Sequence, residues 1–332
     1  MPRRELDRCA EYLPLLTQLM QKMLNGDRQA LARLFSLLER DASQTPPLMK
    51  AIHHQAGRAY CIGVTGPPGA GKSTLVDGLV QLIRGEGSTV GVLAVDPTSP
   101  FSGGAVLGDR IRMKRHYLDE GVFIRSLATR GAHGGLSSVT RAAVRLLDAF
   151  GVDLVLVESV GVGQTELDVM NVADTVVVVL VPEVGDAVQA LKAGLLEIGD
   201  VFVVNKSDRE GAGRVASTIK VEVRANAADR WWSPPVLMTQ AEKGEGLDRV
   251  HGAIAKHRGE SEKSSNMQRR RSERRKWEFT QAVRESVEAR VADQEVQSDE
   301  FSTLVARVQS GDIDPYTAAA QALDGGDLGR PP

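Results

Sequence analysis

The segment GPPGAGKS, residues 66–73, has the composition and spacing of a phosphate-binding loop. It matches G-x-x-x-x-G-K-[ST] in full, follows an apolar run and precedes a helical pattern. Glycines allow the backbone N–H groups to close around phosphates, and the helix N-terminus adds a favourable dipole. We expect Lys72 to reach the β- and γ-phosphates and Ser73 to bind Mg²⁺. The predicted nucleotide contacts in this loop are Gly66, Pro67, Pro68, Gly69, Ala70, Gly71, Lys72, Ser73 and Thr74.

A second motif, N-K-S-D at residues 205–208, indicates which base is bound. The carboxylate of Asp208 can accept hydrogen bonds from N1–H and the exocyclic amine of guanine, whereas adenine offers neither donor there. A site that leaves a buried polar group unpaired rejects the wrong substrate by about 10⁴- to 10⁵-fold. Asn205 would brace the loop, and the stem of Lys206 would lie along the base. The motif alone also fits a turn that ends a strand, but its place downstream of the phosphate loop favours GTP over ATP.

The segment TQAEKGEG, residues 239–246, follows the next predicted strand. Gln240 and Ala241 are candidates for the base site, with the Ala241 N–H donating to guanine O6. An ordinary loop explains this segment almost as well.

Three carboxylates are expected near the carboxyl ends of strands, where open α/β sheets bind ligands. Asp96 ends GVLAVD, Glu158 ends DLVLVE, and Asp109 lies between them. Each alone could cap a helix or a turn. Together, beside a phosphate loop, they favour a shared metal and water site in which they act with Lys72.

The segment after Glu158 resembles a nucleotide-dependent switch. Glu158 stands where D-x-x-G is usual, and its extra methylene lets it hold a metal-bound water or contact the metal directly. Gly161 would offer its N–H to the γ-phosphate, so that loss of this phosphate releases the segment. Gln164 is a candidate for positioning the attacking water, although it lies three residues past Gly161 rather than next to it.

The order of elements predicts how these residues are positioned. Seven short β-branched runs alternate with helical patterns between residues 59 and 257. Strands this continuously apolar predict an α/β fold with a mostly parallel sheet covered by helices on both faces. A helical hairpin over about 11–41 precedes it, with Asp27 as N-cap of the second helix. Residues 258–266 are polar and predict a boundary or bent linker, and helices over 267–296, 300–311 and from Asp314 should follow.

Composition excludes several classes of protein. The 332 residues include 41 Lys and Arg against 43 Asp and Glu, so bulk charge predicts neither nucleic-acid nor membrane partners. No apolar run reaches the roughly 18 residues of a membrane span, and the start lacks a signal or transit pattern. The two cysteines, Cys9 and Cys61, fit a reducing compartment. We therefore expect a cytoplasmic protein.

With these motifs together, the chain resembles the methylmalonyl-CoA mutase-associated GTPases of the MeaB or ArgK type, within the metallochaperone group of P-loop GTPases. The resemblance covers nearly the whole chain, including GVTGPPGAGKSTL, VDPTSPFSGGAVLGDRIRM, VNKSD and GDIDPYTAA. VESVGVGQTE is the most specific segment, because a glutamate in place of the aspartate of D-x-x-G is the family's own form of that motif. The glutamate is thus expected rather than anomalous.

The resemblance implies a GTPase that gates loading, protection and reactivation of adenosylcobalamin on an acyl-CoA mutase. GTP or GDP and Mg²⁺ would bind this chain, whereas adenosylcobalamin would belong to the mutase; a cobalamin adenosyltransferase is a further candidate partner. The implied switches are 96–113, 158–168 and 182–192. The implied organisation is an N-terminal helical extension over 1–57, a GTPase domain over 58–258 and a C-terminal arm over 259–332 that forms a homodimer.

Three alternatives compete with this interpretation. A nickel- or other metal-delivery GTPase would share the fold, but Cys9 and Cys61 are far apart and the six histidines form no ligand-spaced set. A kinase-like P-loop protein is disfavoured by N-K-S-D. A nucleic-acid-binding protein could use RRRSERRK, residues 269–276, but Glu273 interrupts the run, so a solvated helix face or a surface for an acidic partner fits better.

Overall fold

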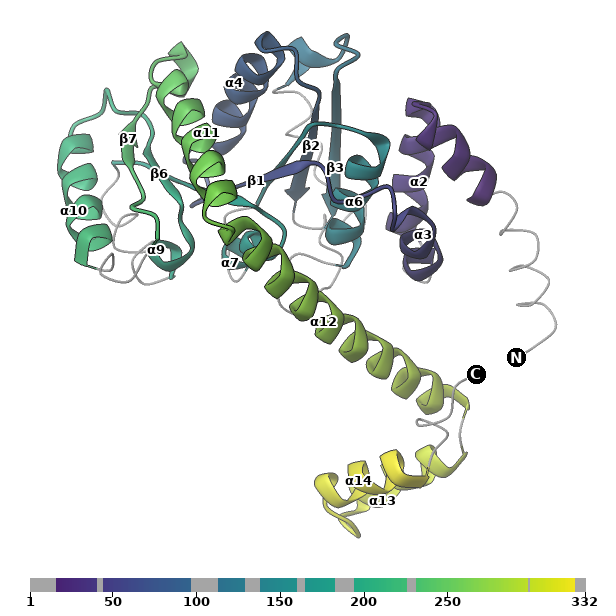
Figure 1. The fold of residues 1–332 in the computed structure, drawn as a ribbon. Coiled ribbons are helices and arrows are strands. Elements are labelled where there is room, and N and C mark those ends of the chain that lie inside the picture. The colour runs from purple at the N-terminus through teal and green to yellow at the C-terminus, as the bar shows by residue number, and fades with distance from the viewer. Residues whose placement is uncertain are drawn as a thin grey trace. The chain divides into compact units, whose positions relative to one another are not determined.

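The computed structural model describes residues 16–40, 44–96, 113–128, 138–159, 165–182, 194–225, 231–297 and 299–325. Contacts within the chain divide it into two compact units, residues 1–270 and 271–332, which we describe separately. The first unit holds the predicted sheet, and the second holds most of the C-terminal helices (Figure 1).

Seven strands form one sheet in the order β3-β2-β4-β1-β5-β6-β7, and every neighbouring pair is parallel. The seven apolar runs of the sequence are these strands, so the predicted α/β fold is confirmed. The strands are β1 (Tyr60–Thr65), β2 (Val90–Asp96), β3 (Val122–Ala128), β4 (Leu154–Glu158), β5 (Thr175–Leu180), β6 (Val201–Val204) and β7 (Val236–Met238).

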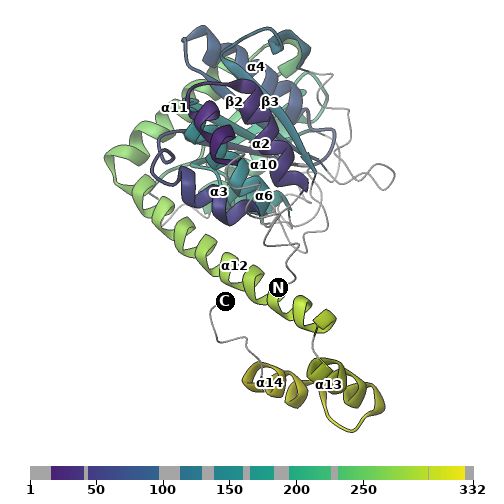
Figure 2. The same ribbon diagram turned by 90° about the vertical axis from the view of Figure 1, so that its right-hand side faces the viewer.

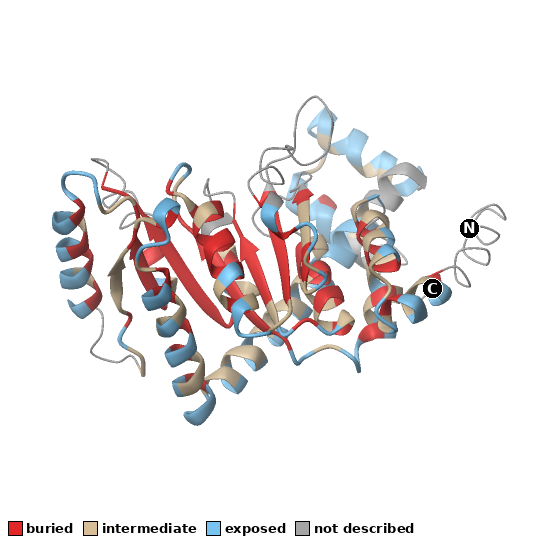
Figure 3. Cartoon of the chain, turned by 90° about the horizontal axis from the view of Figure 1, so that it is seen from above, coloured by how far each residue is buried: buried red, intermediate tan, exposed pale blue. Residues whose placement is uncertain are grey.

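Alternate side chains of each central strand enter two different cores. In β5, Val176 and Val178 face one buried cluster, and Val177 and Val179 face the other. A strand that must be apolar on both sides reads as a continuous hydrophobic run, which is why the sequence pattern was informative. Burial is accordingly high along the central strands, whereas β7 is half-buried and the helices expose their outer surfaces (Figure 3).

Helices α4 and α11 cover one face of the sheet, and α2, α3, α6 and α10 contribute to the core on the other. The elements of the first unit that surround the sheet are α2 (Arg28–Arg40), α3 (Thr45–Ile52), α4 (Lys72–Gly85), η2 (Lys114–His116), α6 (Ser138–Phe150), α7 (Thr165–Asp168), η3 (Val169–Asn171), α9 (Leu195–Ile198), α10 (Ala212–Ala225), η4 (Ala241–Lys243) and α11 (Leu247–Lys263).

The N-terminal helical hairpin is present and belongs to the body of the first unit. Residues 16–24 are helical, and the Asp27 carboxylate accepts the backbone N–H groups of Gln29 and Ala30 at 2.8 and 3.0 Å. The predicted N-cap is therefore confirmed. The next helices, α2 and α3, lie against α6 (Figure 2), and Phe35 of α2 stacks on Phe123 of the edge strand β3 with ring centroids 5.4 Å apart.

The predicted bend at 258–266 is shorter than its polar composition indicated. Residues 258–263 continue α11, and the helix ends at Lys263. An Arg258–Glu262 ion pair of 3.0 Å, one helical turn apart, supports this last stretch. The chain then turns at Ser264 and Ser265, and Ser265 has a positive φ of 57°. Polar residues here mark an exposed helix face rather than a loop.

The last helices are α12 (Asn266–Gln297), α13 (Asp299–Ser310) and α14 (Pro315–Gly325), close to the predicted ranges. Asp314 caps α14, because its carboxylate accepts the N–H groups of Tyr316 and Thr317, each at 3.0 Å. Within the described segments, no helix combines the length and apolarity needed to cross a bilayer.

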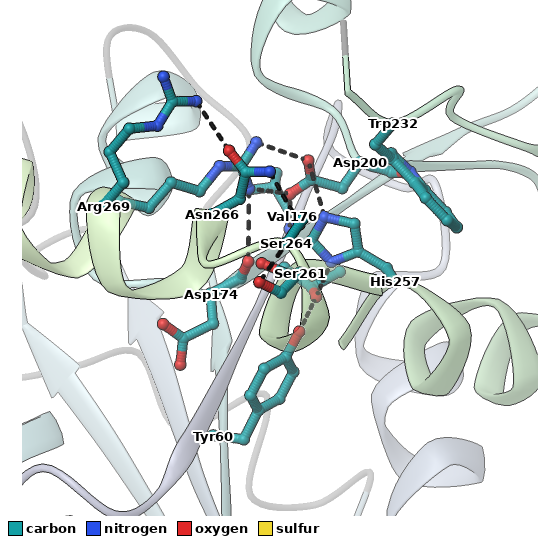
Figure 4. A network of polar contacts seen from close by, with 12 residues as sticks. Tyr60, Asp174, Val176, Asp200, Trp232, His257, Ser261, Ser264, Asn266 and Arg269 are labelled. Carbon is teal, nitrogen blue, oxygen red and sulfur yellow. Dashed lines mark hydrogen bonds and ion pairs between the residues drawn. The ribbon is translucent and has the colours of Figure 1, made fainter. Parts of the chain in front are cut away.

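A buried polar network joins the start of α12 to the amino edge of the sheet (Figure 4). Asp200, directly before β6, accepts the Val176 N–H at 2.9 Å and both Nη groups of Arg270 at 3.0 and 2.9 Å. His257 Nε2 lies 3.4 Å from the same carboxylate, and His257 Nδ1 lies 2.7 Å from Thr175 Oγ1. Burial alone would raise the pKa of Asp200, but hydrogen bonds from His257 and Arg270 hold it below its usual value.

We expect Arg270→Met to lower the free energy of unfolding by about 2 to 3 kcal/mol at pH 7, because it leaves the buried Asp200 charge undercompensated. The value is below that of a fully buried pair, since the Arg270 side chain is 34% exposed. The pKa of Asp200 is lowered on folding, so this stabilisation exists above the unfolded-state pKa of about 4 and is lost as the pH falls further.

Urea unfolding at several pH values measures the effect, and Arg269→Met is the matched control. The exposed side chain of Arg269 donates to the Asn266 side chain at 3.0 Å and makes no other side-chain contact among those described. An equal loss of stability in both variants would contradict the role of the Asp200 network.

Candidate functional site: the carboxyl edge of the sheet

The phosphate loop leaves β1 through a glycine that no other residue could replace. Gly66 has φ 136°, and a Cβ there would lie 2.0 Å from the Val179 carbonyl oxygen. Gly71 ends the loop with φ 87°, and a Cβ there would lie 2.3 Å from Asn205 Nδ2. Two of the motif's glycines are thus favoured by backbone conformation and by the close approach of the Val179 carbonyl and of the Asn205 side chain.

Lys72 and Ser73 begin α4, and both side chains are buried. Lys72 Nζ donates to the carbonyl oxygens of Gly66 and Pro67 at 2.8 and 3.0 Å, so its ammonium lies inside the curve of the loop. Ser73 Oγ donates to Glu158 Oε1 at 2.7 Å. The remaining loop residues have graded exposure: Ala70 is buried, Pro67 and Thr74 are half-buried, and Pro68 and Gly69 are exposed.

Glu158 ends β4 between two strands that also lead to the site. It pairs in register with Val64 of β1 and Ala94 of β2, and its side chain is buried. Asp96 ends β2, two residues beyond Ala94 and at the same edge, but its side chain lies outside the described structure. The predicted meeting of strand ends is thus present for Glu158 and for the Asp96 backbone.

Three predicted residues lie outside the described segments: Asp109, Gly161 and Gln164. Their roles in catalysis, metal binding and phosphate contact stay predictions. Most of the three expected switches also falls outside those segments.

The N-K-S-D loop, residues 205–208, for which a base-reading role is predicted, is bonded directly to the phosphate loop. Asn205 Nδ2 donates to the Ala70 carbonyl at 2.9 Å, and Asn205 Oδ1 accepts from Thr239 Oγ1 and from the Ala241 N–H, both at 3.0 Å. Asn205 is 3% exposed. Its side chain therefore ties three segments together, as expected of a residue that braces the loop.

Lys206 adopts an unusual backbone conformation for a residue with a side chain. Its φ is 54°, in the left-handed region, and its Nζ donates to the Gly69 carbonyl at 2.8 Å. Such a conformation in a non-glycine residue is often found at functional loops. The turn places Asp208 at the surface two residues later.

The Ala241 N–H already donates to Asn205, so its predicted contact with guanine O6 would have to share or replace that bond. Gln240 is held by an antiparallel bridge to Glu245 and is half-buried. Sequence reasoning did not single out Thr239, although its position directly after β7 places it beside Asn205. Only the register of β6 against β7 shows this contact.

Two oxygen atoms of the site are of the kind that binds Mg²⁺. Ser73 Oγ and Glu158 Oε1 lie 2.7 Å apart in a buried pair at the N-terminus of α4. Hydroxyl and carboxylate oxygens are hard ligands of the kind Mg²⁺ binds beside nucleotide phosphates. The Lys72 ammonium lies on the same loop and would face the phosphate charge.

A seven-stranded parallel sheet with a phosphate loop after β1 and N-K-S-D after β6 defines a P-loop GTPase. The family model for the methylmalonyl-CoA mutase-associated GTPase MeaB matches residues 31–296. The chain belongs to this family, and it is a GTPase that binds GTP and GDP.

Known proteins agree with this assignment. A protein of Pyrococcus abyssi that is named as a GTPase is 46% identical over 93% of this chain and 96% of its own length. The GTPase ArgK of Escherichia coli is 33% identical over 92% of this chain and 95% of its own. A crystal structure of an LAO/AO transport system kinase is 28% identical, covers 93% of this chain and 97% of its own, and superposes with a TM-score of 0.68.

Proposed function

We propose that this GTPase binds an adenosylcobalamin-dependent acyl-CoA mutase, with methylmalonyl-CoA mutase as the first candidate, and gates loading and reactivation of its cofactor. The match of the MeaB family model to residues 31–296 carries the proposal, because that family is named for its association with this mutase. The match includes the phosphate loop, Glu158, the base-reading loop and most of α12.

Different residues of the site would bind the phosphates, the metal ion and the base of GTP. Lys72 would exchange its two carbonyl partners for phosphate oxygens, and Ser73 with Glu158 would hold Mg²⁺. When bound, Mg²⁺ neutralises charge on the phosphates during hydrolysis. Asp208 would read guanine while Asn205 keeps its loop in place. Asp96 and Asp109 are proposed to complete the metal and water site.

Output to the mutase would come from the segments that contact the γ-phosphate. We propose that the conformational change occurs in the three predicted switches, residues 96–113, 158–168 and 182–192. The second of these begins at Glu158. Loss of the γ-phosphate would release Gly161 and alter the surface that the mutase contacts. Gln164 stays the candidate for positioning the attacking water.

We also propose a homodimer through the C-terminal helices. Phe279, Val283 and Val287 recur every fourth residue of α12 and are 70%, 46% and 44% exposed, which forms an apolar stripe along one helix face. Sedimentation of the full chain would measure its mass, and a monomer at micromolar concentration would reject the dimer.

The mutase proposal predicts stimulated GTP turnover. We expect slow hydrolysis by the purified chain and a large increase with an adenosylcobalamin-dependent mutase from the same source, up to the ~10³- to 10⁵-fold that a supplied arginine contributes. ATP is the matched control substrate and should show little turnover. Clear GTP hydrolysis that the mutase does not stimulate would support the GTPase assignment but reject the mutase as the partner. Metal delivery would then be the leading alternative function.

A further inference from the structure

Two buried hydroxyl groups join the strand ends directly behind the Ser73–Glu158 pair. Ser159 Oγ donates to Thr65 Oγ1 at 2.9 Å, and the two residues are 2% and 0% exposed. The Ser159 N–H also donates to the Val64 carbonyl at 2.9 Å. The carboxyl ends of β1 and β4 are therefore joined by one backbone bond to Val64 and by one side-chain bond between the two residues that follow the last pair.

Each hydroxyl lies next in sequence to a part of the site. Thr65 immediately precedes Gly66, where the phosphate loop begins, and Ser159 immediately follows Glu158. At Gly66 the backbone already passes so close to the Val179 carbonyl that a Cβ would lie 2.0 Å from it. The start of the loop thus has little freedom on that side, and the hydroxyl bond restrains it against β4.

We propose that Thr65 and Ser159 form a positioning pair that holds the Glu158 carboxylate in reach of Ser73, and so sets the affinity for Mg²⁺ in the nucleotide complex. The inference rests on the proposed metal role of Ser73 and Glu158. Both hydroxyls act through Glu158 and the loop rather than by touching the nucleotide.

The size of the effect follows from the bond that is lost. Removing either hydroxyl breaks one buried hydrogen bond between the ends of β1 and β4. If the loss of this bond falls on the arrangement of Glu158, the affinity for Mg²⁺ changes by about five- to tenfold, which is the effect of one ordinary hydrogen bond. The nucleotide itself keeps its contacts with the phosphate loop and the base-reading loop.

The experiment measures release of a fluorescent GDP, N-methylanthraniloyl-GDP, from the full chain at a series of Mg²⁺ concentrations. For Ser159→Ala we expect about five- to tenfold more Mg²⁺ for half-maximal slowing of release, whereas release in EDTA changes less than about twofold. GTP turnover at saturating Mg²⁺ should also stay within about twofold. Ser159→Thr retains the hydroxyl and should restore the normal Mg²⁺ dependence.

A double-mutant cycle with Thr65→Val tests whether the two hydroxyls act as one unit. Thr65→Val should shift the Mg²⁺ dependence as far as Ser159→Ala does, and the double variant should be no worse than either. Additive shifts, or an unchanged Mg²⁺ dependence in the single variants, would overturn the inference. Should Ser159→Ala fail to fold, Thr65→Val with Thr65→Ser as its rescue tests the same bond from β1.

Glu158→Gln separates this inference from the proposal on which it rests. If Glu158→Gln leaves the Mg²⁺ dependence of release unchanged, the metal role of Glu158 is wrong and the inference falls with it. If Glu158→Gln shifts that dependence and Ser159→Ala does not, only the positioning role is overturned. The mutase is absent from every arm, so the outcome is independent of the proposed partner.

Discussion

Lys72→Ala is expected to weaken GTP binding by about 10³-fold or more. The Lys72 ammonium is buried and donates to two carbonyl oxygens of its own loop, at 2.8 and 3.0 Å, so it is already placed where phosphates would lie. Hydrogen bonds to charged groups contribute about 1.5 to 3 kcal/mol each, and two of them account for about 4 kcal/mol, or 10³-fold in affinity. Calorimetric titration with GTP measures the loss.

The matched control for this variant is Lys220→Ala, which removes an exposed lysine from α10. It should bind GTP as the unmodified chain does. Because Lys72 also bonds to the loop backbone, thermal unfolding without nucleotide must accompany the titration. Unchanged GTP affinity in a folded Lys72→Ala variant would refute the assignment of the phosphate site.

Asp208→Ala is expected to remove the preference for GTP over ATP, which we place at about 10⁴- to 10⁵-fold. Asp208 is exposed on the turn that follows the left-handed Lys206, so its carboxylate can face a base without rearranging the core. Asn205 keeps its bonds to Ala70, Thr239 and Ala241 in this variant, and the phosphate loop is untouched. Competition binding with GTP and ATP measures the ratio.

Asp208→Asn provides a gain-of-function control at the same position. An amide in place of the carboxylate presents a donor as well as an acceptor, which complements xanthine, where a carbonyl replaces the 2-amino group of guanine. We expect this variant to prefer XTP to GTP. A retained preference for GTP over ATP in Asp208→Ala would show that another loop reads the base.

The parts of the molecule that the sequence predicted well are those set by local chemistry. The strands follow from short apolar runs, and in the central strands burial on both faces leaves no alternation to misread. The phosphate loop depends on glycines within eight residues, and the caps at Asp27 and Asp314 are formed by carboxylates that bond to N–H groups two and three residues ahead. Short-range rules suffice for such features.

Features that depend on pairing between distant segments could not be predicted in this way. Arg270 belongs to a run of basic residues for which the sequence favoured a solvated helix face. It instead bonds to Asp200, seventy residues earlier in the chain. This contact forms because α11 brings the start of α12 to the amino end of β6. Thr239 bonds to Asn205 through the alignment of β6 with β7. The tie between Thr65 and Ser159 likewise requires β1 and β4 to be neighbours, and nothing in either segment alone indicates that they are.

The short strand β6 joins two sites of different character. Asp200 precedes its first residue and forms the ion pair with Arg270, and Asn205 follows its last residue and bonds to the phosphate loop. Side chains alternate between the faces of a strand, so one inserted or deleted residue would turn one of these two groups away from its partners. Evolution can therefore exchange one apolar side chain for another within β6, but its length is constrained from both ends at once.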